Sequence, residues 1–409
     1  MQFYIKQIQV NQILHLSGFT INLGNSPKHL LITGQNGSGK TQLIKAIAEH
    51  LQKVCNDSTS SRLKLESLIS MWGRNVRLAT SEDELRHAKM MLAKTKAQWQ
   101  SFYGKVNVSF NDEYAMTDAY CANDFILAFY QTFRNPDFIE VRSIEKPDLN
   151  RPNDLNQNKV GQFLKFLADN KVQAALARNE GHDQDAENIN KWFDSFQGVL
   201  RGLFGDPALK LDFDYTDYSF YINSLGKRFK FTQLSAGYAA ALDIVADLIL
   251  RMQKPGSLVR AYDKPGIVLI DEPETHLHLA LQRQIMPILT KLFPNVQFVV
   301  ATHSPFILSS LPNAVAYDLE HREELTDLTE YSYGALAEGY FGVDMASGDL
   351  SARVSRLETL VAKENLESAE SAELKDLFKD LETVSEAAAP AIKGRILELK
   401  RKYLAKGAK

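Results

Sequence analysis

The stretch that decides the fold is Leu30-Leu-Ile-Thr-Gly-Gln-Asn-Gly-Ser-Gly-Lys-Thr41. An apolar run ends at a glycine, and residues 34–41 then match the pattern GxxxxGK[ST]. Glycines in such a loop let successive backbone N–H groups point at phosphate oxygens, and the loop opens the helix that follows. We therefore expect a buried strand, a phosphate-binding loop and a helix in succession, with Lys40 reaching the outer phosphates and Thr41 facing Mg²⁺.

Two later apolar runs also end in residues suited to phosphate chemistry. Gly266–Pro273 ends in two adjacent carboxylates, and Val299–Pro305 contains a histidine just after its apolar part. Ligands of α/β sheets bind at the carboxyl ends of the strands, so these side chains are expected at the same edge as the phosphate loop. At that edge Asp271 would hold magnesium through water, Glu272 would polarise an attacking water, and His303 would contact the γ-phosphate.

A fourth segment, Thr232-Gln-Leu-Ser-Ala-Gly-Tyr238, precedes a long apolar helix. Taken alone, it predicts an ordinary helix capped by Ser235, with Gly237 in the first turn. The same helix N-terminus, with a hydroxyl and free N–H groups, is also suited to binding an anion.

These four elements, in this order, resemble the nucleotide-binding head of ABC-class ATPases. The resemblance implies an α/β fold, an ABC-type P-loop head with a mixed sheet flanked by helices, and ATP hydrolysis with ATP and Mg²⁺ as cofactors. In that family the LSGGQ-like signature of one head closes over the phosphate loop of another. The resemblance therefore implies a head-to-tail homodimer or a higher even oligomer, with Ser235 and Gly237 supplied in trans to the ATP held by Lys40.

The family's functional positions carry over residue by residue. Glu272 and His303 would be catalytic, and Mg²⁺ would be held by Thr41, Asp271 and Gln131. Gln131 is assigned by its place alone, because it ends the apolar run Phe125–Gln131 where the family has its Q-loop glutamine. ATP would be bound by Gly34, Asn36, Gly37, Ser38, Gly39, Lys40, Thr41, Gln131, Ser235 and Gly237.

Local phrases narrow the branch of the family. DEPETHLHL and FPNVQFVVATHSP look like the AAA-type ABC ATPases of the RecF, SMC and OLD grouping, although Leu279 replaces a proline common there and His278 an aspartate common in transporters. The chain lacks the heptad length of an SMC arm and, after Ser310, the strands and carboxylates of a Toprim nuclease. It is similar to the stand-alone ATPases of anti-phage modules such as Septu, PARIS and certain retrons, in which the ATPase controls a separately encoded effector, often a nuclease.

This resemblance predicts the regulatory subunit of an anti-phage complex. The head would span residues 1–345, with helical inserts at about 56–104 and 150–205, and residues 346–409 would form a helical partner-binding region. The middle of this tail is acidic and its end basic, so its helices either pair with one another or bind an effector. Alternation across Leu209–Phe231 predicts a hairpin.

Composition limits the remaining possibilities. A net charge of -3 gives no global basic field, and no apolar run reaches the roughly 18–20 residues of a membrane helix. With two distant cysteines and no secretory signal, we expect a cytoplasmic protein without a membrane partner. The alternative function is a RecF-like DNA-repair ATPase that binds duplex DNA, and a transporter subunit is a third interpretation. DNA binding would use the basic C-terminus and the first insert's Arg62, Lys64, Arg74, Arg77, Arg86, Lys89, Lys94 and Lys96.

Overall fold

The computed structural model describes residues 2–56, 59–134, 136–150, 155–253, 262–325, 328–330, 336, 348–363, 367–382 and 390–407. The chain divides into two compact units, Met1–Tyr331 and Ser332–Lys409. Each unit contains a hydrophobic cluster of its own. The head boundary predicted at residue 345 lies outside the described residues.

Among the described residues, six strands form the central sheet of the first unit, in the order β12-β11-β3-β10-β9-β5. β11, β3, β10, β9 and β5 are parallel, and β12 pairs antiparallel with β11. β3, β5, β9 and β10 are buried along their whole length, as expected of apolar runs covered on both faces. The bounds are β3 (His29–Thr33), β5 (Ile126–Tyr130), β9 (Gly266–Asp271), β10 (Val296–Ala301), β11 (Ala314–Asp318) and β12 (Glu323–Leu325).

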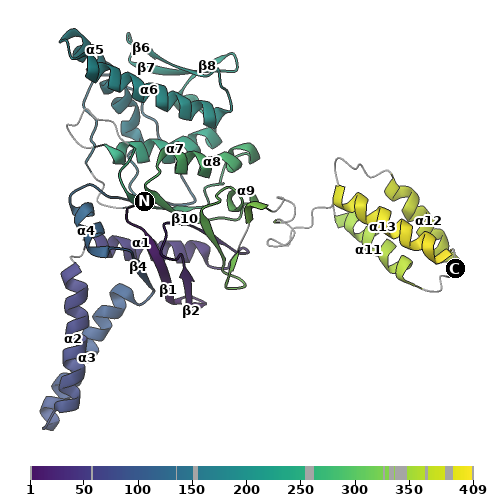
Figure 1. The fold of residues 1–409 in the computed structure, drawn as a ribbon, viewed down its shortest axis with the longest axis horizontal. Helices are drawn as coiled ribbons and strands as arrows, with labels where there is room; N and C mark the ends of the chain where they lie inside the picture. Colours follow the sequence, from purple (N-terminus) through teal and green to yellow (C-terminus); the bar gives the residue numbers. More distant parts are fainter. Residues whose placement is uncertain are drawn as a thin grey trace. The chain divides into compact units, whose positions relative to one another are not determined.

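Helices cover both faces of this sheet (Figure 1). α1 (Lys40–Asn56) packs on one face and contacts β9 and β10, while α7 (Ala236–Met252) and α8 (Leu279–Leu292) lie on the other. A second, antiparallel sheet in the order β2-β1-β4 shares the hydrophobic core of α1. The predicted α/β class, a parallel-rich mixed sheet flanked by helices, is confirmed. The second sheet and its helix comprise β1 (Ile5–Ile13), β2 (Leu16–Asn22), β4 (Val106–Phe110) and α4 (Glu113–Cys121).

Both inserts contain paired helices. α2 (Thr59–Leu78) packs along α3 (Glu82–Tyr103), and the two form the hairpin seen in Figure 1. Ser81 lies between the two helices and caps the start of α3. Its hydroxyl accepts a hydrogen bond from the Glu84 N–H, and the Glu84 carboxylate accepts one from the Ser81 N–H. In the second insert, α5 (Phe163–Asn179) packs against α6 (Asp183–Phe204) through an aromatic cluster. Short helical segments complete the unit: Val160–Gln162, Phe231–Gln233, α9 (Pro305–Leu308) and Leu328–Glu330.

The hairpin predicted after the second insert is a three-stranded sheet, β6 (Lys210–Asp214), β7 (Ser219–Ser224) and β8 (Lys227–Lys230). The prediction missed the second turn, in which Leu225 and Gly226 both have positive φ, at 50° and 73°. Such a pair forms the tight turn that joins antiparallel strands, but leucine is a poor sequence signal for it. The turn is held in part because the Leu225 N–H donates to the Asp206 carboxylate at 3.0 Å.

The second unit contains α11 (Gly348–Ala362), α12 (Ser368–Glu382) and α13 (Pro390–Gly407). Leucine, valine, isoleucine and phenylalanine side chains from all of these helices form its core. Among the described residues, one ion pair, Lys400 with Glu382, joins the basic end of the tail to its acidic middle, as one of the two sequence interpretations predicted; the other ion pairs between these segments involve α11 or the residue that follows it. Ion pairs join Arg356 to Glu373, Lys363 to Glu370, Arg395 to Glu358, and Lys400 to Glu382. In the part of the chain that the structure describes, no helix is long and apolar enough to cross a bilayer.

His29, at the start of β3, makes stability depend on pH. Its ring is 5% exposed, and its Nδ1 accepts from the Phe298 N–H at 3.1 Å. Burial lowers the His29 pKa to about 4. Between pH 6.5 and 4, His29 therefore binds a proton in the unfolded chain but not in the folded chain. His29 should therefore lower the free energy of unfolding by about 2 kcal/mol between pH 7 and pH 5.

Urea unfolding at the two pH values measures this loss. The variant His29→Asn retains an acceptor for Phe298 but cannot be protonated there, so it should show a correspondingly smaller loss than the wild type. Equal losses in both proteins would contradict the assignment.

Candidate nucleotide-binding site

The central sheet brings three of the four sequence motifs to one edge. β3 pairs with β10, and β10 pairs with β9, all in parallel. Ala301 lies opposite both Ile32 and Asp271, so the residues that follow these three strands emerge side by side. The phosphate loop, the acidic pair and the histidine, which are up to 260 or so residues apart in the chain, are therefore neighbours in the fold.

The phosphate loop has the backbone that its glycines permit. Gly34, Gly37 and Gly39 all have positive φ, at 137°, 85° and 97°. A Cβ on Gly34 would lie 2.8 Å from Oγ of Ser38, so the loop closes only around a bare Cα at that position. Its helix, α1, begins at Lys40, where free N–H groups can meet an anion.

The Lys40 side chain folds into this loop. Its Nζ donates to the carbonyl oxygens of Gly34 and Gln35, at 2.7 and 2.9 Å. Burial lowers the Lys40 pKa to about 8, although the nearby carboxylates of Glu272, Glu274 and Asp271 oppose the shift. A phosphate group beside this ammonium would favour its charged form, which is the usual behaviour of a lysine that binds nucleotide phosphates.

Asp271 lies between two hydroxyl groups. Its Oδ1 accepts from Thr41 at 3.3 Å, and its Oδ2 accepts from Thr132 at 2.9 Å. Burial raises the Asp271 pKa, and a cation beside the carboxylate would reverse that effect. A carboxylate with hydroxyl neighbours is an all-oxygen donor set of the kind that Mg²⁺ prefers, so these residues fit the ion.

Glu272 occupies a strained turn next to His303. Its backbone has φ 49°, in the left-handed region that non-glycine residues rarely adopt. The turn places its Oε1 3.6 Å from Nε2 of His303, and its Oε2 accepts from the Thr275 hydroxyl at 3.3 Å. Both side chains are a little under one-third exposed, so a water molecule can reach them. Burial, followed by the charge of Lys40, lowers the His303 pKa and favours the neutral ring.

Glu274 supports the histidine from beneath, and sequence reasoning missed it. Its Oε1 accepts from the Thr302 hydroxyl at 2.7 Å and from the His303 N–H at 2.6 Å. Burial raises the pKa of this carboxyl. The contact joins the turn that follows β9 to the residues that follow β10, and the DEPE phrase was the available signal.

The signature segment lies on a different part of the head. Ser235 is exposed at the N-terminus of α7, and its hydroxyl does not cap that helix. Gly237 is closely packed, since a Cβ there would lie 2.8 Å from the carbonyl oxygen of His276. Tyr238 stacks on Phe204 with ring centroids 4.2 Å apart, and the His278 ring meets Tyr238 edge-on. The signature thus packs on the loop that follows Glu272, and its serine is exposed.

Gln131 does not contact the acidic pair through its side chain in this structure. Its Nε2 donates to Asn156 at 3.0 Å, and the next residue, Thr132, is the one that reaches Asp271. Asn36 and Gly37 are exposed at the tip of the phosphate loop, where His15 also contributes a ring nitrogen 3.1 Å from the Ser38 carbonyl. Thr132 and His15 were not foreseen, because neither belongs to a recognisable sequence pattern.

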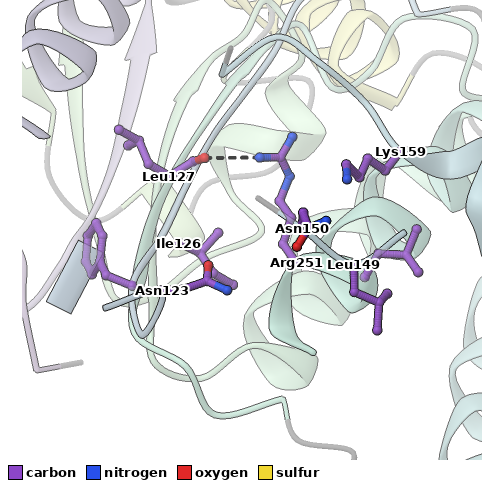
Figure 2. Close-up of a pocket in the computed structure, with 9 residues that line it drawn as sticks. Asn123, Ile126, Leu127, Leu149, Asn150, Lys159 and Arg251 are labelled. Atoms are coloured by element: carbon purple, nitrogen blue, oxygen red, sulfur yellow. Dashed lines mark hydrogen bonds between the residues drawn. The ribbon is translucent and has the colours of Figure 1, made fainter. Parts of the chain in front are cut away.

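Cavities flank the site beside Arg134. One of about 460 Å³ is lined by Gln131, Asn156 and Asp243, and another of about 430 Å³ by Leu234 and other signature residues. A third, of only about 20 Å³, lies at the opposite end of β5, where Arg251 donates to the Leu127 carbonyl at 3.3 Å (Figure 2). Because its lining comes from the start of β5 and the end of α7, it is not part of the nucleotide site.

The chain is similar to several known proteins. Residues 120–309 match a family described as "AAA domain, putative AbiEii toxin, Type IV TA system". The chain is 24% identical to the Septu protein PtuA of Bacillus mycoides over 92% of its own length and 50% of that protein. It is 44% identical to the "Retron Ec83 probable ATPase" of Escherichia coli over 81 residues, which are 19% of this chain and 15% of that protein. The chain thus spans at most about half the length of these two relatives.

Among solved structures, the Smc head domain with an extended coiled coil, bound to the C-terminal domain of ScpA derived from Pyrococcus furiosus, aligns over 77% of this chain and 93% of that chain. The alignment has a TM-score of 0.35 and 11% identity. With its phosphate loop and sheet edge, its match to an AAA domain family and its Septu and retron relatives, this chain is similar to the ABC-like ATPases of bacterial defence systems.

Proposed function

We propose that the chain binds and hydrolyses ATP as a head-to-tail pair and controls a separately encoded effector, such as a nuclease, in an anti-phage complex. The observation that carries the ATPase proposal is the meeting of Lys40, Asp271, Glu272 and His303 at one edge of the sheet. The relatives support the defence role, since they are a Septu protein and a retron ATPase. Phosphate release that requires Mg²⁺ is the first test, and a protein that releases none would contradict the proposal.

In this proposal the phosphate loop binds ATP through its backbone N–H groups, with Lys40 on the outer phosphates. Thr41 and Asp271 would hold Mg²⁺, and Gln131 would complete the set if its side chain left Asn156. An ion held there would supply positive charge to offset the negative charge of the phosphates. The remaining ATP-binding groups are those assigned by resemblance: Gly34, Asn36, Gly37, Ser38 and Gly39 in one head, and Ser235 and Gly237 from the other.

Glu272 and His303 divide the work at the γ-phosphate. The Glu272 carboxylate accepts a hydrogen bond from the attacking water and orients it toward phosphorus. The neutral His303 ring contacts a γ-phosphate oxygen, and its own position is fixed by Glu274. Because phosphoryl transfer relies on positioning and charge rather than covalent catalysis, a shift of the turn that carries Glu272 would be enough to slow the reaction.

Pairing of heads is supported by the exposed signature. Ser235 is exposed at the start of α7 and its hydroxyl makes no helix-cap hydrogen bond, so it is accessible to a phosphate held by another head. A symmetric pair would form two such composite sites, and a larger assembly would be built from pairs.

The effector is expected to bind the second unit. That unit has a core of its own and its tail charges largely satisfy one another, so its folding does not depend on those charges being met by a partner. Tagged full-length chain, expressed with its neighbouring genes, should recover the effector, whereas a chain ending at Tyr331 should bind ATP yet recover none. If both proteins recovered the effector equally, the second unit would not be its binding site. If neither protein recovered an effector, the proposal that the chain controls a separate effector would be contradicted.

Duplex DNA binding by the pair is the second candidate. It is favoured by exposed basic residues along α2 and α3, although Arg62 lies outside the described side chains. Affinity for duplex that falls steeply with salt, together with faster ATP turnover on DNA, would support this function. The exposed basic residues are Lys64, Arg74, Arg77, Arg86, Lys89, Lys94 and Lys96.

A further inference from the structure

Arg134 lies behind the catalytic turn, where its guanidinium group contacts the main chain rather than an acidic side chain. Nη1 donates to the carbonyl oxygens of Gln131, at 3.1 Å, and Asp271, at 3.4 Å. Nη2 donates to the carbonyl oxygens of Glu272 and Pro273, both at 3.4 Å. One side chain therefore spans three consecutive carbonyl groups of the turn that carries Asp271 and Glu272.

Glu272 has particular need of such support. Its φ of 49° is strained for a residue with a side chain, and a strained conformation persists only where its surroundings hold it. Carbonyl groups turned together repel one another, and a cation placed among them offsets that repulsion. Only a planar guanidinium presents several donors in a fixed fork that can reach three carbonyls at once.

An arginine beside a nucleotide site commonly contacts a phosphate or forms an exposed salt bridge. The structure favours neither. The two terminal nitrogens donate to carbonyl oxygens, and Nε is buried without a hydrogen-bond partner among the described residues. A guanidinium held in this way is directed at the backbone beneath Glu272 and Asp271.

We propose that Arg134 is a positioning residue for ATP hydrolysis, which fixes the Asp271–Pro273 turn so that the Glu272 carboxylate faces the attacking water. The proposal rests on the proposed ATPase function and adds to it. Arg134 also lines both larger cavities, one beside the signature and one beside Asp243 of α7. The turn is thus held by a side chain that shares a cavity with the signature segment.

Steady-state ATP hydrolysis by Arg134→Ala tests the proposal in the full-length protein. Because a displacement of about 1 Å of a positioned group can cost about 100-fold in rate, kcat should fall about 10- to 100-fold. The dissociation constant for ATP should change less than about threefold, since no phosphate contact is lost. Arg142→Ala, which removes an exposed arginine from the same connecting segment, is the matched control and should retain wild-type kcat.

Two further measurements separate positioning from general damage to the fold. Arg134→Lys should restore part of kcat, and low concentrations of guanidinium should raise the rate of Arg134→Ala but not that of wild type. In the Glu272→Gln background, Arg134→Ala should cause little additional loss, because both changes act through the same carboxylate.

The results also distinguish this inference from the function on which it rests. If wild type hydrolyses no ATP, the proposed function fails. If wild type is active and Arg134→Ala keeps its kcat, or loses ATP binding instead of kcat, the positioning role is overturned. If neither lysine nor guanidinium restores activity and the double variant loses rate in full, Arg134 has only a structural role and the inference is again overturned.

Discussion

Replacing Glu272 by glutamine should lower the rate of ATP hydrolysis at least about 100-fold while ATP binding is retained, because a well-placed general base contributes roughly 100- to 10,000-fold. The amide keeps the shape of the side chain, so the turn and the contact with the Thr275 hydroxyl can persist. Loss of the carboxylate removes the acceptor that orients water. ATP bound under these conditions should remain between two heads, because the step that ends the paired state no longer occurs.

Single-turnover phosphate release and light scattering measure the two halves of this expectation. With Mg²⁺ and ATP, Glu272→Gln should have the mass of a pair or of a larger even assembly, and it should lose that mass when Mg²⁺ is removed by a chelator. Glu323→Gln, at an exposed position on β12, is the control and should behave as wild type. Full turnover by Glu272→Gln would show that another residue acts on the water.

Mixing two inactive variants should restore hydrolysis if the site is composite. Lys40→Ala removes the ammonium that the phosphate loop encloses, so it should abolish ATP binding in its own head. Ser235→Arg places a bulky cation at the exposed start of α7, so it should block the partner's site without touching its own phosphate loop. Each variant alone should be inactive, since every site in a symmetric pair then carries the defect.

An equal mixture is different, because random pairing makes about half of the pairs mixed and each mixed pair has one intact site. The mixture should therefore recover up to about one quarter of wild-type turnover if the two sites act independently. Crosslinking confirms that mixed pairs form. Full activity of Ser235→Arg alone would show that the signature is not used in trans, and mixed pairs without any hydrolysis would contradict a composite site made of Lys40 and Ser235.

Much of the site could be predicted because its chemistry depends on local sequence. The glycines at 34, 37 and 39 predict a loop with positive φ. The apolar runs that end in Asp271 or just before His303 predict buried strands whose carboxyl ends carry functional side chains. Because the strands are parallel, their carboxyl ends lie at the same edge of the sheet, and this can be predicted before any side-chain contact is known. The sheet, the phosphate loop and the acidic pair follow from these rules.

The unpredicted parts depend on contacts between distant residues. Thr132 reaches Asp271 across 139 positions, and Arg134 reaches the same turn across a similar interval. No local pattern distinguishes these side chains from ordinary loop residues, so no role was predicted for Thr132, whereas Gln131 was assigned by its place alone. The third strand of the small sheet was missed for the opposite reason, since a leucine took a conformation normally reserved for glycine or asparagine.

The contact between Gly237 and the His276 carbonyl has a consequence for a pair of heads. That contact has no room for even one additional carbon atom, so the signature helix and the loop after Glu272 cannot shift independently. In a head-to-tail pair, the signature serves one nucleotide and the loop serves the other. Each head would thus join, through one close backbone contact, the signature that serves one ATP to the loop that serves the other.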